Sequence, residues 1–152
     1  MFGEKEKKVV YIGADHRGFK KKNELKEILI SEGYDVTDLG SFDEEPYDYP
    51  LIAREVSEKV LERKGSIGVL MCGTGIGVSI AANKLIGIRA VNAHDEKEAE
   101  MSRRHNDANV IAFGADNVDV EDMKKMTNVF LNTDFESTIE RYVRRVKKID
   151  LT

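Results

Sequence analysis

Short runs of β-branched and apolar residues alternate with longer amphipathic segments, and this alternation is what most restricts the fold. The runs that indicate strands cover residues 9–14, 34–39, 67–71, 88–93 and 109–113. The run at 67–71 is continuously apolar, as expected for a strand that is buried on both faces. Parallel strands need long crossover connections, which are usually helices. The alternation therefore predicts an α/β protein with a five-stranded parallel sheet.

The intervening segments carry apolar residues at helical spacing. They predict helices over residues 19–32, 49–64, 78–84, 95–104, 120–131 and 139–149, the last being an additional C-terminal helix. Gly33 and Gly65 follow two of these helices and are typical C-terminal stops, and Asp95 is a candidate N-terminal cap. No linker rich in Gly, Ser or Pro divides the 152 residues, so we expect a single domain over 1–152.

Charge and composition exclude several classes of function. The net charge is -4, from 24 basic and 28 acidic side chains, which argues against non-specific nucleic-acid binding. No segment approaches the ~18 apolar residues that a membrane span needs, and the charged N-terminus does not resemble a signal peptide. Cys72 is the single cysteine, so an intrachain disulfide and a multi-cysteine zinc cluster are excluded. A single cysteine is simplest to interpret as a sign of a reducing, cytoplasmic setting. We expect no metal site, because no His, Asp and Glu set has convincing ligand spacing.

Two unusual sequences follow predicted strands. In a parallel sheet of this class, ligands bind beyond the carboxyl ends of the strands, where strand order reverses. We expect that crevice between the first and third strands. Asp15-His16-Arg17-Gly18 follows the first strand, and Cys72-Gly73-Thr74-Gly75-Ile76-Gly77 follows the third. The two sequences are therefore expected to lie close together.

The glycine-rich loop is a candidate anion site, because successive amides ahead of a helix can hold negative charge. It lacks the spacing of a dinucleotide fingerprint and the Gly-Lys-Ser/Thr ending of a nucleoside-triphosphate loop. A plain tight turn is the alternative. Cys72 lies where amide donors and a helix dipole would favour its thiolate, although buried structural cysteines are common. Its place beside this loop favours the reactive interpretation.

Other polar residues carry weaker signals. His16 is supported by Asp15 and the expected crevice, and His105-Asn106 by the polar segment around it, whereas His94 has no comparable support. Arg141 and Arg145 are four residues apart on a predicted helix and could hold one phosphate together. A solvated basic face is the simpler interpretation of that pair.

Taken together, the motifs resemble the ribose-5-phosphate isomerase B and galactose-6-phosphate isomerase family. The resemblance covers about residues 9–149. It is carried by Gly13-Ala14-Asp15-His16-Arg17-Gly18-Phe19, Asp48-Tyr49-Pro50, Cys72-Gly73-Thr74-Gly75-Ile76-Gly77, Ser79-Ile80-Ala81-Ala82-Asn83-Lys84, Gly87-Ile88-Arg89-Ala90 and Ser102-Arg103-x-His105-Asn106-Asp107-x-Asn109, where x marks a position that does not contribute.

The resemblance implies a Rossmann-like three-layer sandwich and a metal-independent aldose–ketose isomerase of phosphorylated sugars that uses no cofactor. It also implies a homodimer or homotetramer whose active sites are shared between subunits. Cys72 matches the general base and His105 the residue that opens the sugar ring, with the latter supplied by the neighbouring subunit. The remaining matches are Thr74 as a catalytic residue and Asp15, His16, Gly73, Gly75, Ile76, Gly77, Asn106, Arg141 and Arg145 as substrate-binding residues.

Two departures from the family pattern leave the substrate open. Many members carry an arginine shortly after the fifth strand, where this chain has Asp116, and Tyr142 stands where members often have a histidine. An acidic side chain repels a phosphate unless it is paired or turned away. Ribose 5-phosphate is the expected substrate. A six-carbon sugar 6-phosphate and a non-catalytic sugar-phosphate sensor are the alternatives.

Overall fold

The computed structural model describes residues 7–151. Its centre is a five-stranded sheet in which every pairing is parallel, with strand order β2-β1-β3-β5-β4. The strands are β1 (Val9–Ala14), β2 (Asp35–Asp38), β3 (Ile67–Cys72), β4 (Ala90–Asn92) and β5 (Val110–Gly114). The predicted five-stranded parallel sheet is confirmed.

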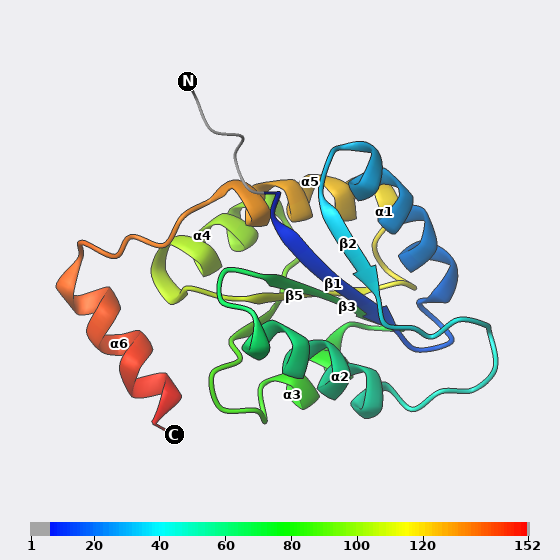
Figure 1. Cartoon of the computed structure of the whole chain (residues 1–152), viewed down its shortest axis with the longest axis horizontal. Coiled ribbons are helices and arrows are strands. Elements are labelled where there is room, and N and C mark those ends of the chain that lie inside the picture. Colours follow the sequence, from blue (N-terminus) through cyan, green and yellow to red (C-terminus); the bar gives the residue numbers. More distant parts are fainter. Residues whose placement is uncertain (1–6, 152) are drawn as a thin grey trace.

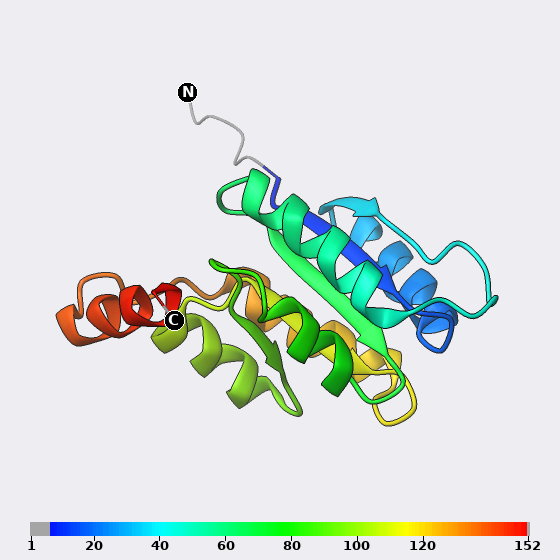
Figure 2. The same ribbon diagram turned by 90° about the horizontal axis from the view of Figure 1, so that it is seen from below.

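Helices cover both faces of this sheet and make a three-layer sandwich (Figure 1). Helices α1, α4 and α5 lie on one face, and α2 and α3 lie on the other. Their bounds are α1 (Phe19–Ser31), α2 (Tyr49–Glu62), α3 (Ile76–Ala82), α4 (Glu96–Asn106) and α5 (Val120–Asn132). The C-terminal helix α6 (Glu140–Asp150) projects beyond the end of the sheet that is opposite the strand arrowheads (Figure 2).

Each face of the sheet has its own apolar core. Leu25, Leu29, Met123 and Phe130 pack against one face, together with the strand residues that point to it. Ile52, Val56, Val60 and Val78 pack against the other. Strands β3 and β5 are buried along their whole length, because helices cover both of their faces. The core therefore fixes the position at which these two strands end.

The sheet reverses its strand order where the sequence predicted. The crossover through α1 leads from β1 to β2 on one side, and the crossover through α2 returns to β3 on the other side of β1. The connection after β3 continues away from β1. The carboxyl ends of β1 and β3 therefore flank the switch point of the fold.

The expected element boundaries are mostly close, with two informative differences. Helix α3 begins at Ile76 rather than residue 78, so Ile76 and Gly77 belong to its first turn and not to the loop. Strand β4 is limited to Ala90–Asn92, because the Arg89 amide donates to Asn109 Oδ1 (2.9 Å) instead of continuing a strand ladder. None of the helices between residues 7 and 151 is both long and apolar enough to cross a membrane.

Candidate active site

Cys72 is the last residue of β3, at the switch point of the sheet. Only 4% of it is exposed. The backbone N–H of Gly75 donates to its Sγ over 3.2 Å. This donor is placed to stabilise negative charge on the sulfur. The sequence-based expectation of an amide contact at this cysteine is met by one specific residue.

Gly75 makes that contact possible through its backbone conformation. Its φ of +79° lies in the left-handed region, where a side chain is strained. A Cβ on Gly75 would also lie 2.7 Å from Asn92 Oδ1 and 2.8 Å from the carbonyl carbon of Phe113. A larger residue would therefore push the loop away from β5 and take the amide off the sulfur.

The remaining residues of the glycine-rich loop connect Cys72 to helix α3. Thr74 is exposed, and its Oγ1 accepts from the N–H of Ile76 over 3.3 Å. Helix α3 has only seven residues, so its dipole is small, and stabilisation of charge at Cys72 falls mainly to the neighbouring amide. Tyr49, at the start of α2, lies against Gly77, where a Cβ would come within 2.7 Å of the tyrosine ring.

Asp15 and His16 follow β1, which pairs with β3, so they lie after the neighbouring strand as predicted. Asp15 is buried, and its Oδ1 accepts from the amides of Arg17 (2.9 Å) and Gly18 (3.2 Å), which fixes the turn into α1. The His16 Nδ1 accepts from the Tyr47 N–H over 3.1 Å. Because an amide can only donate, the neutral His16 ring carries its proton on Nε2. That nitrogen is left as a donor.

Asp116, which the sequence placed at the phosphate end of the site, forms an ion pair with Arg17. The pair joins the loop after β1 to the loop after β5, over the top of β3. Lys21 strengthens the same junction, because its Nζ donates to the carbonyl oxygens of Ala115 (2.6 Å) and Val118 (2.7 Å). The acidic side chain is thus paired rather than isolated.

His105 and Asn106 lie elsewhere, in the last turn of α4. The His105 ring lies 4.7 Å from the ring of Tyr142 on α6. The Arg141 guanidinium stacks over the same tyrosine at 4.8 Å. Arg145 is exposed on α6, one turn further along. His105, Arg141 and Tyr142 therefore form a second cluster.

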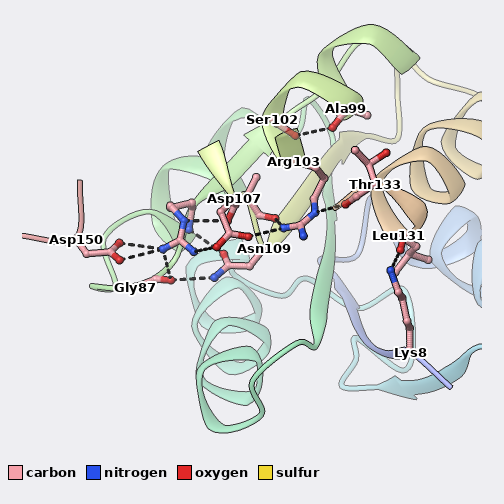
Figure 3. Close-up of polar contacts among 12 residues, drawn as sticks. Lys8, Gly87, Ala99, Ser102, Arg103, Asp107, Asn109, Leu131, Thr133 and Asp150 are labelled. Atoms are coloured by element: carbon pink, nitrogen blue, oxygen red, sulfur yellow. Dashed lines mark hydrogen bonds and ion pairs between the residues drawn. The ribbon is translucent and has the colours of Figure 1, made fainter. Parts of the chain in front are cut away.

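A network of ion pairs holds the end of α4 that carries this cluster (Figure 3). Asp107 ends the helix in a left-handed conformation, with φ of 48°. Its carboxylate accepts from Arg103 (3.0 Å) and pairs with Arg89 (3.4 Å). Arg89 also donates to both carboxylate oxygens of Asp150 at 3.0 and 3.1 Å, which ties the end of α6 to the same point.

The two clusters lie at opposite ends of the sheet within one chain. Cys72 is in register with Gly114 at the end of β5, whereas Asn106 precedes the start of β5 at Val110. Four residues of strand separate these levels by about 13 Å. A single chain therefore does not bring His105 to Cys72.

Comparisons with known proteins show the family of this chain. The Ribose/Galactose Isomerase family matches residues 10–149. The chain belongs to this family. It is 41% identical over 142 residues to ribose-5-phosphate isomerase B of Escherichia coli strain K12, covering 93% of this chain and 94% of that protein.

Solved structures of ribose 5-phosphate isomerases share the fold. One from Thermotoga maritima has a TM-score of 0.90 at 36% identity, covering 95% of this chain and 98% of that one. The type B enzyme of Trypanosoma cruzi has a TM-score of 0.89 at 40% identity, covering 95% and 97%. The predicted resemblance, the α/β sandwich and the assignment as an isomerase are confirmed.

Within this ribose/galactose isomerase, two residues near Cys72 were not selected from the sequence. Tyr49 and Arg17 both lie in the sequence motifs, but the motifs predict no role for either residue. Spacing gave no signal for Arg17, because its partner Asp116 is 99 residues away. Asp116 was the one signal in the sequence, because an acidic side chain next to an expected anion site needs a neighbouring cation.

Proposed function

We propose that this chain is an aldose–ketose isomerase that interconverts ribose 5-phosphate and ribulose 5-phosphate. The observation that carries the proposal is the buried Cys72 thiol, with the Gly75 amide donating to its sulfur at the switch point of the sheet. Membership of the ribose/galactose isomerase family supplies the reaction class. The substrate is proposed from relatives that are named ribose-5-phosphate isomerase B.

In the proposed reaction Cys72 is the general base. Its thiolate removes the proton from C2 of the open-chain aldose. The C–H electron pair becomes the C1–C2 double bond, and the carbonyl oxygen on C1 takes the negative charge of an enediolate. Return of a proton to C1, with transfer of the O2 hydroxyl proton to O1, gives the ketose. Oxidation at C2 balances reduction at C1, so no external electron acceptor is required.

The glycine-rich loop is proposed to stabilise the enediolate. The amides of Gly73 and Gly77 and the Thr74 hydroxyl are the donors proposed for this role, since the Ile76 amide donates to Thr74 Oγ1. Preorganised donors of this kind are typically worth ~3–4 kcal/mol each to a transition state with charge on oxygen. Asp15 is proposed to accept a hydrogen bond from a substrate hydroxyl on the facing side. The Nε2–H of His16 is proposed to donate to a substrate hydroxyl or phosphate oxygen there.

His105 and Asn106 are proposed to come from a second copy of the chain, as the resemblance implies. His105 would open the sugar ring by proton transfer, and Arg141 and Arg145 would bind phosphate. The separation of the two clusters within one chain supports this arrangement. A homodimer is then the smallest active unit, and a tetramer is compatible with it.

Exposed apolar side chains support association through α2 and α3. Ile76 and Ile80 lie one turn apart on α3 and are 55% and 58% exposed, and Leu51 on the adjoining α2 is 54% exposed. An apolar patch of this kind often marks a protein–protein interface. The patch lies beside the Cys72 loop, so a copy bound there would reach the crevice.

A six-carbon sugar 6-phosphate remains the alternative substrate, because the family includes galactose isomerases. The test is a coupled assay of kcat/KM for pentose 5-phosphates and hexose 6-phosphates. We expect a clear preference for ribose 5-phosphate. A preference for a hexose 6-phosphate would contradict the proposed substrate but not the proposed aldose–ketose isomerisation. Binding without turnover of any sugar phosphate, seen by calorimetry, would instead favour a sensor and contradict the proposal.

A further inference from the structure

We propose that Arg17 is an additional substrate-binding residue, whose guanidinium binds the phosphate group, and that Asp116 holds this guanidinium in place until the substrate arrives. The inference rests on the proposed function, since it assigns a further residue to the same site. It starts from the ion pair between Arg17 and Asp116, which joins the loops that follow β1 and β5.

The Arg17 side chain lies against the loop that follows Cys72. A Cβ on Gly73 would come within 2.4 Å of the Arg17 Cζ, 2.5 Å of Nη1 and 2.7 Å of Nε. These three atoms are nearly equidistant from the position that a Gly73 Cβ would take. The plane of the guanidinium therefore faces Gly73, and no single nitrogen points at it. Glycine at position 73 is thus the residue that leaves space for the cation.

Most of the hydrogen-bonding capacity of Arg17 is uncommitted. Its Nη2 donates to Asp116 Oδ2, and no other side-chain hydrogen bond of Arg17 is found among residues 7–151. A guanidinium has five N–H donors, whose fork matches the oxygens of a phosphate. The Arg17 and Asp116 side chains are 54% and 41% exposed, and pairs as exposed as this contribute little, so a dianion can displace the carboxylate.

The other cations near Arg17 in the same chain are already engaged. Lys20 pairs with Glu44 at 3.4 Å, and Lys21 donates to two backbone carbonyl oxygens of the loop after β5. Asp15 and Asp116 are both acidic. Without Arg17, a dianionic substrate entering beside the glycine loop would meet two carboxylates of this chain.

The position of Arg17 also fits the phosphate rather than the reacting carbons. Cys72 is buried, so C1 and C2 must approach the floor of the crevice. The phosphate of a pentose 5-phosphate lies three carbon atoms beyond C2, which places it toward the rim. Arg17 is exposed at that rim, directly above the residue that follows Cys72.

The test combines two variants with a matched control in the full-length protein. Arg17→Gln removes the cation, and Asp116→Asn keeps an acceptor oxygen but removes the competing charge. Lys59→Gln removes one positive charge from an exposed ion pair with Glu62 on α2 and serves as the control. Calorimetry with inorganic phosphate gives Kd, and the coupled assay gives kcat and KM for ribose 5-phosphate at constant ionic strength.

We expect Arg17→Gln to raise both the phosphate Kd and the substrate KM by about 10-fold or more, with kcat within about threefold, because a charged hydrogen bond to phosphate is lost. Asp116→Asn should lower the phosphate Kd by a few-fold, and the control should match wild type. Unchanged Kd and KM in Arg17→Gln would overturn the assignment, as would a loss confined to kcat. Weaker phosphate binding by Asp116→Asn would contradict the proposal that phosphate displaces the Asp116 carboxylate from Arg17.

The two readouts also separate this inference from the proposed function. If the wild-type protein turned over no sugar phosphate, the proposed function would fail. The phosphate Kd of wild type and of Arg17→Gln would still decide whether Arg17 binds the anion.

Discussion

At the residue scale, the contact between Gly75 and Cys72 is the centre of the account. The sulfur is nearly inaccessible to solvent, and one amide donates to it. Replacing Cys72 with serine keeps the shape of the side chain but substitutes a hydroxyl that is far less acidic. Because general bases contribute about 10²–10⁴-fold, we expect kcat for isomerisation to fall by about 10³-fold with KM little changed.

The Cys72→Ser measurement needs evidence of folding, which circular dichroism and thermal unfolding supply. A variant that is folded and retains wild-type kcat would show that another group removes the proton.

Gly75→Ala tests the geometry of the loop rather than its chemistry. The left-handed φ and the crowding by Asn92 and Phe113 both oppose a side chain there. We expect kcat/KM to fall by about 10²-fold, since a displacement of about 1 Å at the reacting centre has that effect. Strain should also lower the free energy of unfolding by about 2 kcal/mol, measured by urea denaturation.

Gly33→Ala is the matched control for that substitution. Gly33 also has positive φ, at 95°, but a Cβ there meets nothing within 4 Å. The free energy of unfolding of Gly33→Ala should fall by about 1 kcal/mol, because of the backbone conformation alone. Its isomerase activity should equal that of wild type. Equal losses of activity in both variants would mean that the Gly75 contact has no special role.

Residue types and motifs were sufficient to select Cys72, Asp15, His16 and His105, because each lies in a distinctive segment. They were not sufficient to pair Arg17 with Asp116, or the Tyr47 amide with His16. Those contacts join separate loops, and only the folded sheet brings the loops together.

At the element scale, the loop between β2 and α2 is anchored by a buried lysine of α1. Lys22 is 0% exposed, and its Nζ donates to Asp38 Oδ1 (2.9 Å) and to the Ser41 carbonyl (2.5 Å). Burial lowers the pKa of Lys22, partly offset by Asp38. Burial by itself would raise the pKa of Asp38, but hydrogen bonds from Lys22, Gly40 and Lys26 outweigh it and the pKa is lowered.

Asp38→Asn should therefore destabilise the fold in a pH-dependent way. At neutral pH it leaves the Lys22 ammonium buried without its counter-charge, which costs about 3 kcal/mol. Because the folded pKa of Asp38 is depressed, its stabilising effect is present above the unfolded value of about 4 and is lost as pH falls through the folded pKa. Urea denaturation of both proteins from pH 7 to 3 should show the difference shrinking below pH of about 4. A difference independent of pH would contradict this assignment.

The periodicity of apolar residues predicted the order and type of every element among residues 7–151, because most helices and strands bury one consistent face or run. It placed the start of α3 two residues late. Glycines at 75 and 77 suggested an extended loop, whereas only Gly75 has the left-handed conformation and Gly77 is helical.

At the scale of the whole molecule, the exposed apolar side chains of α3 predict self-association. Ile80→Glu places a charge at the proposed interface, so sedimentation should shift toward monomer and isomerase activity should fall by about 10-fold or more. Ile30→Glu is the control, since Ile30 is 46% exposed on α1, across the sheet. It should leave mass and activity unchanged. A fully active Ile80→Glu monomer would contradict the shared site.

In the proposed assembly, one active site combines Cys72 of one copy with His105 of another, and mixing two inactive variants tests this arrangement. Cys72→Ala and His105→Ala should each have little activity. After dissociation and re-association at equal concentrations, the mixture should recover about a quarter of wild-type activity, because half of the dimers are mixed and each holds one intact site. A mixture that recovers nothing, although mass spectrometry shows mixed dimers, would contradict the claim.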